Sequence, residues 1–109
     1  MDIYDANGSK VGYVKDDGST YNVHGHKLGE VTQNGWVNAK GIPVGFVFSE
    51  GHINTIRGEK VGEVSSKGTV QDEKGTPIGK VDVAGDFLLA TGGAALLFLL
   101  TEENNYGLS

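Results

Sequence analysis

Glycine recurs in this chain at fixed spacings, and this spacing limits the possible folds more than any other feature of the sequence. Of the 18 glycines, 15 fall into three columns that repeat five times, with steps of four and then six residues inside every repeat. The repeat is 17 residues long, and 16 residues once, over residues 1–85. Self-similarity at a fixed period predicts several copies of one supersecondary unit. The first, middle and third columns are Gly8, Gly25, Gly41, Gly58 and Gly75; Gly12, Gly29, Gly45, Gly62 and Gly79; and Gly18, Gly35, Gly51, Gly68 and Gly85.

Apolar residues repeat in step with the glycines. One column lies directly before the middle glycine, a second is valine two residues after it, and a third lies four or five residues before the first glycine. Short β-branched runs separated by Asn-Gly and Asp-Gly pairs are typical of strands joined by tight turns. Each repeat is therefore predicted to be a β-hairpin, which gives about ten short strands. The apolar columns are Val11, Leu28, Val44, Val61 and Ile78; Val14, Val31, Val47, Val64 and Val81; and Ile3, Tyr21, Val37, Ile53 and Val70.

The middle glycine needs an explanation, because glycine inside a strand costs about 0.5–1 kcal/mol relative to alanine. In a regular strand, the apolar residue before it and the valine three positions further on would lie on opposite faces. A β-bulge at the glycine brings both to one face, and we favour this interpretation. The alternative is a regular strand whose glycine faces inward, toward a bulky neighbour. The two interpretations are compatible.

An apolar segment follows the last repeat. Asp86 is a favourable helix N-cap, and a helix that is apolar on all sides must be buried in protein or in lipid. Ten strands leave an axial hole that a helix about 10 Å wide can fill. We therefore predict a mainly β fold: a small closed antiparallel barrel of five repeated β-hairpins in residues 1–85, with a central hydrophobic C-terminal α-helix in residues 86–100 of the same domain. Residues 101–109 are a polar tail.

A membrane anchor is the less favoured interpretation of the same segment. A bilayer span needs about 20 apolar residues, whereas residues 87–100 are 14 and have no Lys or Arg at either end. The N-terminus lacks the charged and then apolar pattern of a signal peptide, and the chain has no cysteine. We expect a cytoplasmic protein, with peripheral membrane association as the alternative.

The pattern G-x-x-φ-G-x-V-x-x-x-G, where φ is apolar, together with the C-terminal segment resembles the β-flower proteins, which are small barrels of radially arranged hairpins. The resemblance covers residues 1 to about 100 and implies a five-fold barrel without an established activity. The architecture is similar to tubby C-terminal-like barrels, and tubby-type phosphoinositide binding would need a cationic pocket. Glu30 and Glu63 would partly cancel the one possible basic ring. That ring consists of Lys10, Lys27 and Lys60, with Pro43 and Pro77 in the other two repeats.

No residue pattern predicts catalysis. His24 and His26 flank a turn glycine with no carboxylate close by in the sequence, and His52 is expected on the outer surface, so we expect no metal site. Acidic pairs lie in predicted turns or in the tail, where they are solvated. A serine nucleophile elbow, a phosphate-binding loop and a dinucleotide fingerprint are missing. We expect no enzyme activity and no cofactor. A net charge of −5 with only nine Lys and Arg argues against nucleic-acid binding.

The third repeat breaks the five-fold pattern with three aromatic residues. Trp36, Phe46 and Phe48 occupy columns that are mostly polar in the other repeats. If these columns face solvent, the residues form an apolar patch typical of protein interfaces. The alternatives are that Phe46 or Phe48 points inward, or that the patch packs on the tail. We predict a non-enzymatic structural or interaction module that binds a protein partner or a second copy there. The alternative function is a barrel whose rim binds a small molecule or a lipid headgroup.

Overall fold

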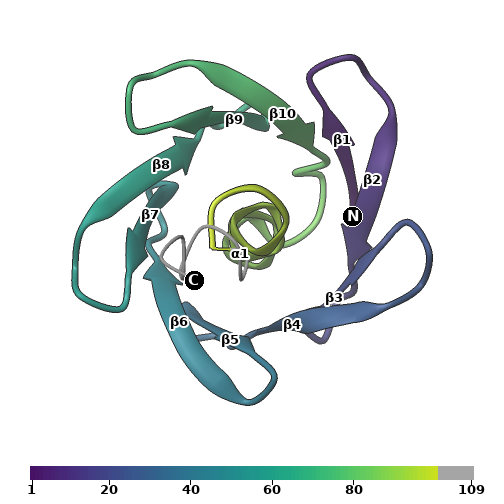
Figure 1. The fold of residues 1–109 in the computed structure, drawn as a ribbon. Coiled ribbons are helices and arrows are strands. Elements are labelled where there is room, and N and C mark those ends of the chain that lie inside the picture. Colours follow the sequence, from purple (N-terminus) through teal and green to yellow (C-terminus); the bar gives the residue numbers. More distant parts are fainter. Residues whose placement is uncertain (101–109) are drawn as a thin grey trace, which may run out of the picture.

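The computed structural model describes residues 1–100, which form a closed barrel of ten antiparallel strands around one helix (Figure 1). Every strand pairs with the strands before and after it in the chain, and β1 pairs with β10 to close the sheet. The predicted mainly β barrel with a central C-terminal helix is confirmed. The elements are β1 (Asp2–Asp5), β2 (Lys10–Val14), β3 (Ser19–Asn22), β4 (Lys27–Val31), β5 (Trp36–Ala39), β6 (Ile42–Val47), β7 (His52–Thr55), β8 (Lys60–Val64), β9 (Thr69–Asp72), β10 (Pro77–Val81) and α1 (Phe87–Phe98).

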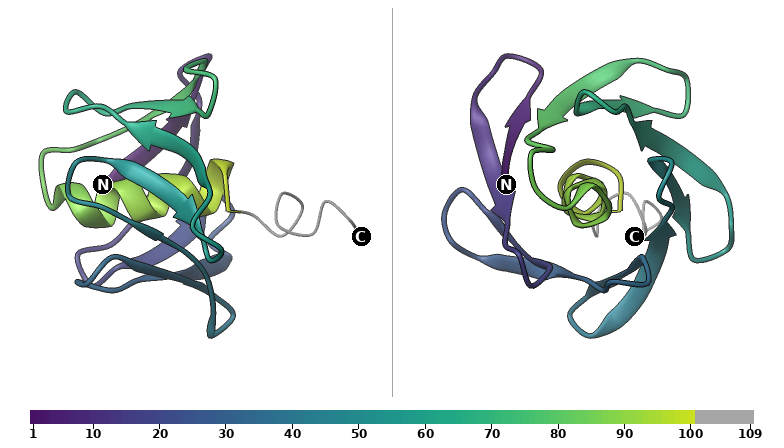
Figure 2. Two further views of the ribbon diagram at one scale, coloured as in Figure 1. Left: turned by 90° about the vertical axis from the view of Figure 1, so that its left-hand side faces the viewer. Right: turned by 180° about the vertical axis from the view of Figure 1, so that it is seen from behind.

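Consecutive strands form five hairpins, which we number petals 1 to 5 from β1–β2 to β9–β10. The petals splay away from the axis of α1 at one end of the barrel, where the helix ends (Figure 2). The first-column glycines lie in the turns at the splayed ends. The four turns that connect one petal to the next contain the first four third-column glycines and lie at the opposite end, where α1 begins. We call the splayed turns the petal tips: residues 5–10, 22–27, 39–42, 55–60 and 72–77.

A β-bulge precedes the middle glycine in every petal. In petal 1, Ile3 lies opposite Gly12 but the next pair is Tyr4 and Lys10, so Val11 is an extra residue in β2. The same register shift recurs in the other four petals. A bulge bends its strand and increases the local twist, which explains why the petals splay beyond this point. The favoured interpretation of the middle glycine is confirmed.

The middle glycines also lie against bulky neighbours, as the alternative interpretation required. At Gly12, Gly45, Gly62 and Gly79, a Cβ atom would overlap both a carbonyl oxygen of the adjacent strand and a side chain near the end of the helical segment. At Gly29, the backbone of β5 alone fills this space. Both interpretations therefore hold together. The side chains concerned are those of Leu97, Phe98, Leu99 and Leu100.

One member of the third apolar column, Tyr21, lies outside the core. In repeat 2 the residue that enters the core is Thr20, which is fully buried, and Tyr21 lies half-buried on the outer face. The core position follows the third-column glycine by two residues, as Thr20 follows Gly18, and alternation along the strand places the next residue outside. Apolar character alone suggested Tyr21. The buried hydroxyl of Thr20 donates a hydrogen bond to the carbonyl oxygen of Gly18 (3.4 Å).

The 16-residue repeat has a shorter petal tip. In petal 3, Ala39 pairs with Ile42, so only Lys40 and Gly41 form the turn. Both have positive φ, 55° and 80°, as a two-residue hairpin turn of type I′ requires. The missing residue is therefore accommodated in the turn, and the register stays the same, with Val37 opposite Gly45 as Ile3 is opposite Gly12.

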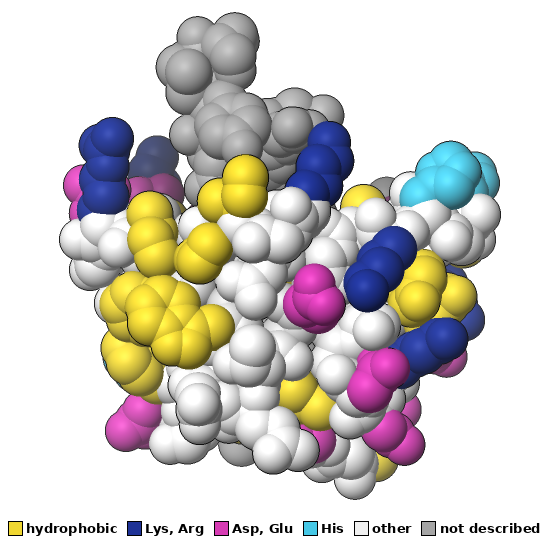
Figure 3. Space-filling model, turned by 90° about the horizontal axis from the view of Figure 1, so that it is seen from below, with side chains coloured by type: hydrophobic (Ala, Val, Ile, Leu, Met, Phe, Trp, Pro, Cys, Tyr) yellow, Lys and Arg dark blue, Asp and Glu magenta, His cyan; other side chains and the backbone are white. Residues whose placement is uncertain are grey.

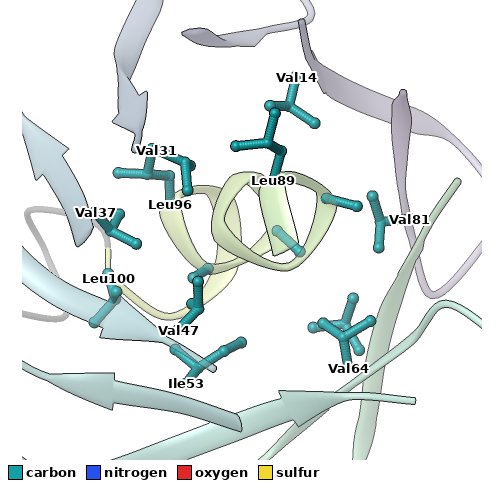
Figure 4. Close-up of a cluster of buried hydrophobic side chains, with 14 of the residues drawn as sticks. Val14, Val31, Val37, Val47, Ile53, Val64, Val81, Leu89, Leu96 and Leu100 are labelled. Carbon is teal, nitrogen blue, oxygen red and sulfur yellow. The ribbon is translucent and has the colours of Figure 1, made fainter. Parts of the chain in front are cut away.

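The helix α1 fills the barrel (Figure 4). Gly92 and Gly93 let the sheet approach it closely, because a Cβ atom there would overlap Val31 and Val14 respectively. The Oδ1 atom of Asp86 accepts a hydrogen bond from the N–H of Leu89 (3.1 Å), which confirms the predicted N-cap. Among residues 1–100 there is no helix long and apolar enough to cross a membrane. A ring of buried valines, one from each repeat, surrounds the helix: Val14, Val31, Val47, Val64 and Val81.

Candidate interaction surface

Three aromatic side chains form a continuous cluster on the outer wall of petal 3. Trp36 on β5 lies directly opposite Phe46 on β6, with ring centroids 5.6 Å apart. Phe48 follows β6 and lies 5.3 Å from Phe46, edge to face. Trp36 is 45% exposed and Phe48 is 40% exposed, while Phe46 between them is half-buried. We call these three residues the aromatic cluster, and Figure 3 shows the hydrophobic surface on this side of the barrel.

The strand pattern holds the cluster outside the core. Val37 and Val47 are buried neighbours of the cluster in the chain, and successive residues of a strand point to opposite faces. The N–H of Trp36 donates a hydrogen bond to Oγ1 of Thr32 (3.1 Å), and the turn before β5 is thereby fixed. The structure thus brings the three predicted residues together and places none of them in the core. Packing of the cluster on the tail concerns residues 101–109, which lie outside the described residues.

Each petal has one pair of directly opposed residues at the position that Trp36 and Phe46 occupy in petal 3. Both residues of the pair are aromatic in petal 3 alone. Since the other four petals form the same hairpin with different residues at this position, the barrel itself does not require an aromatic pair there. The equivalent pairs are Asp2 and Tyr13, Ser19 and Glu30, His52 and Glu63, and Thr69 and Lys80.

A second aromatic pair lies on the outer wall and is not part of the sequence prediction. Tyr13 on β2 stacks on Tyr21 on β3, with centroids 5.2 Å apart and rings inclined by 17°. The ammonium groups of Lys10 and Lys15 lie 5.3 Å and 4.9 Å from these ring centroids. The alignment of Tyr21 with the third apolar column concealed the pair. The signal that reveals it is the position of Tyr21, three residues after its third-column glycine.

The possible basic ring is ion-paired along the outer wall. Lys27 lies 3.7 Å from Glu30, and Lys60 donates a hydrogen bond to Glu63 (2.7 Å). This hydrogen bond lowers the pKa of the Glu63 carboxyl below its ordinary value. Lys10 lies 3.2 Å from the carboxylate of Asp2. The glutamates therefore offset the lysines as expected, and these lysines do not converge on one cationic pocket.

The described residues offer little for metal or acid–base chemistry. The rings of His24 and His26 lie 6.3 Å apart at the tip of petal 2, and no group of three His, Asp or Glu in residues 1–100 could hold a metal ion. An open hollow of about 530 Å³ lies between the N-terminus and the turn after β2. There a hydrogen bond from the backbone N–H of Ser19 lowers the pKa of Asp17. A lowered pKa is opposite to what a general acid needs.

Five radially arranged hairpins around one apolar helix define the class of this protein as a radially repeated, mainly β barrel. The chain belongs to the family of 5-fold beta-flower proteins, which it matches over residues 1–99. The resemblance inferred from the glycine pattern is thereby confirmed. A search of the curated proteins and a search of the solved structures each give no match.

Proposed function

We propose that this protein is a non-enzymatic interaction module that binds another protein through the aromatic cluster. The supporting observation is the exposure of Trp36 and Phe48 on either side of Phe46. Tryptophan is enriched among the residues that dominate the binding energy of protein interfaces, because it buries a large apolar area with few rotatable bonds, and phenylalanine is enriched at interface centres. The restriction of the cluster to one petal of five fits a single binding surface on a repeated scaffold.

The charges around the cluster indicate the chemistry of the partner. Glu50 is exposed two residues after Phe48, and Glu30 on β4 lies in the neighbouring petal. The whole chain carries a net charge of −5. A complementary partner presents an apolar anchor residue flanked by Lys or Arg. A second copy fits less well, because two acidic copies repel each other. We propose a cytoplasmic location, where a fold without cysteine needs no disulfide.

The test removes the two exposed rings and leaves Phe46 in place. We expect the double variant Trp36→Ala/Phe48→Ser to recover at least about tenfold less partner from the producing cells than the wild type does. Hot-spot residues each contribute about 2 kcal/mol or more to binding. The melting temperature of this variant should fall by only a few degrees, because exposed cross-strand aromatic pairs contribute about 1 kcal/mol. The measurement is affinity purification with quantitative mass spectrometry, alongside thermal melting by circular dichroism.

The matched control removes two rings elsewhere on the outer wall. The variant Tyr13→Ser/Tyr21→Ser should retain the partner. Trp36 is the single tryptophan of the chain, so the emission of the wild-type protein should shift to shorter wavelength when the purified partner binds. Equal recovery of every protein by the wild type and both variants would contradict the proposal. A fall in stability that unfolds the cluster variant would also contradict it, since that result places the rings in the core.

A further inference from the structure

Exposed aliphatic side chains gather at the tips of three neighbouring petals. In residues 1–100, five large hydrophobic residues are exposed, and two of them belong to the aromatic cluster. The other three are Val23 in petal 2 (51% exposed), Ile42 in petal 3 (61%) and Ile56 in petal 4 (48%). Petals 1 and 5 have Ala6 and Glu73 at the position of Val23 and Ile56. The turns therefore do not require these aliphatic side chains.

Positive charge concentrates at the same end of the barrel. The petal tips hold six of the nine Lys and Arg residues but four of the fourteen Asp and Glu residues, so their net charge is +2 in a chain of net charge −5. Figure 3 shows Lys, Arg and His side chains along the upper edge, where the tips lie. The cations are Lys10, Lys27, Lys40, Arg57, Lys60 and Lys74, and the acids are Asp5, Glu59, Asp72 and Glu73.

The tips of petals 2 to 4 combine both properties. This sector contains four of the six cations and a single acid, Glu59. Lys27 and Lys60 pair with glutamates on the wall, but exposed ion pairs of this kind contribute little, so their ammonium groups can turn to another anion at small cost. We call residues 22–27, 39–42 and 55–60 the petal rim. It contains three exposed aliphatic side chains, and each of the three turns that carry them also contains one or two cations.

We propose that the petal rim docks this protein on an anionic phospholipid bilayer. Val23, Ile42 and Ile56 enter the interfacial layer, and the neighbouring Lys and Arg side chains lie at the headgroup phosphates. The three aliphatic residues come from separate turns with polar loop residues between them. A protein interface needs a continuous apolar centre, whereas a bilayer accepts separate side chains wherever they enter it. The splay of the petals places the tips at one end of the barrel, where α1 ends (Figure 2).

The experiment is co-sedimentation of the full chain with vesicles made of equal parts phosphatidylcholine and phosphatidylserine, and with phosphatidylcholine vesicles. We expect binding to the anionic vesicles and at least about tenfold weaker binding to the neutral vesicles, because each Lys or Arg near an anionic surface contributes about fivefold. The variants Ile42→Ser/Ile56→Ser and Lys27→Glu/Arg57→Glu should each weaken binding to the anionic vesicles at least about tenfold.

Two controls separate this inference from the aromatic cluster. Lys67→Glu/Lys80→Glu makes the same charge change away from the tips, and Trp36→Ala/Phe48→Ser removes apolar surface away from the tips. We expect both variants to bind the anionic vesicles within about threefold of the wild type, because the residues they replace lie away from the rim. The emission of Trp36 should stay unchanged on binding, because Trp36 lies at the far end of β5 from the tip.

Three results would overturn the docking proposal: no binding to anionic vesicles, binding that both rim variants retain, or a blue shift of Trp36 emission with loss of binding in the cluster variant. The last result assigns the lipid contact to the cluster. Circular dichroism of every variant checks that the barrel is intact. Rim residues are exposed at turn tips, so their replacement is not expected to unfold the chain.

Discussion

Deletion of residues 86–109 is expected to leave a chain that no longer unfolds cooperatively. The helix contributes Leu89, Leu96 and the following Leu100 to the core, and burial of three leucine side chains is worth together about 5–9 kcal/mol. That amount is comparable to the whole stability of a small domain, about 5–15 kcal/mol. Without α1, the ring of five valines would also face an empty axis, and neither the sheet nor its turns can contract to fill it.

The deletion is measured by thermal unfolding and by the dispersion of amide resonances in solution. The matched control deletes residues 101–109 alone, which lie beyond the matched family region, and we expect it to keep a cooperative transition. If the chain ending at Gly85 were a soluble monomer with a sharp melting transition, the barrel would not depend on its helix for stability.

Gly68→Ala is expected to destabilise the barrel by at least about 3 kcal/mol, and Gly75→Ala by only about 1 kcal/mol. The two glycines flank β9 and share a left-handed backbone, with φ of 94° and 83°. A Cβ atom at Gly68 would overlap the carbonyl oxygen of Val81, whereas nothing lies within 4 Å of a Cβ atom at Gly75. The hydrogen bond from Val81 N–H to Gly68 O (2.8 Å) holds these backbones together, so neither can withdraw.

Comparison of Gly68→Ala with Gly75→Ala separates the cost of close backbone contact from the cost of the left-handed backbone conformation, because the conformational cost in free energy of unfolding is the same for both variants. Thermal melting should separate them by roughly 8–16 °C, since 1 kcal/mol shifts the melting temperature of a chain this size by about 4–8 °C. Equal melting temperatures would show that the third-column glycines are needed for their backbone conformation alone, and that the connecting turns do not pack on the next strand.

The fold was predictable from the sequence because one unit recurs five times. Fixed steps between glycines, valine two residues after each middle glycine, and an apolar segment after the last repeat together require hairpins around a buried helix. The bulge was predictable for the same reason, since only a face switch keeps both apolar columns inside. The glycine contacts with Leu97 and Phe98 follow from the same geometry once the helix is placed on the axis.

The sequence pattern did not show which residues of each strand face inward and which face outward around the bulge. Tyr21 was aligned with Ile3, Val37, Ile53 and Val70 because it is apolar, whereas strand register places the smaller Thr20 at that position. The stacked Tyr13–Tyr21 pair was hidden by this error. The petal rim was not predictable either, because the splay that exposes Val23 and Ile56 results from five bulges acting on a closed sheet. The aromatic cluster was predictable in outline, since Trp36, Phe46 and Phe48 occupy columns that are mostly polar in the other repeats.

The two proposed surfaces lie at opposite ends of the barrel, so each can be altered without the other. The aromatic cluster lies toward the end of the barrel where α1 begins, and the petal rim lies at the end where α1 finishes. Because β5 separates Trp36 from the tip of petal 3, a variant at one surface leaves the other unchanged. A membrane-docked barrel would therefore present the cluster away from the bilayer, available to a protein partner. Loss of one binding activity with retention of the other is the expected outcome for each set of variants.

The fold depends on close contact between the sheet and α1 at the two glycines of the helix, Gly92 and Gly93. Nuclear Overhauser effects measure this contact directly in the full chain. We predict cross-peaks from the Hα protons of Gly92 to the methyl groups of Val31, and from those of Gly93 to the methyl groups of Val14, since the pairs are in close contact. Contacts of Gly92 and Gly93 with residues of their own helix alone, and none with either valine, would contradict the account.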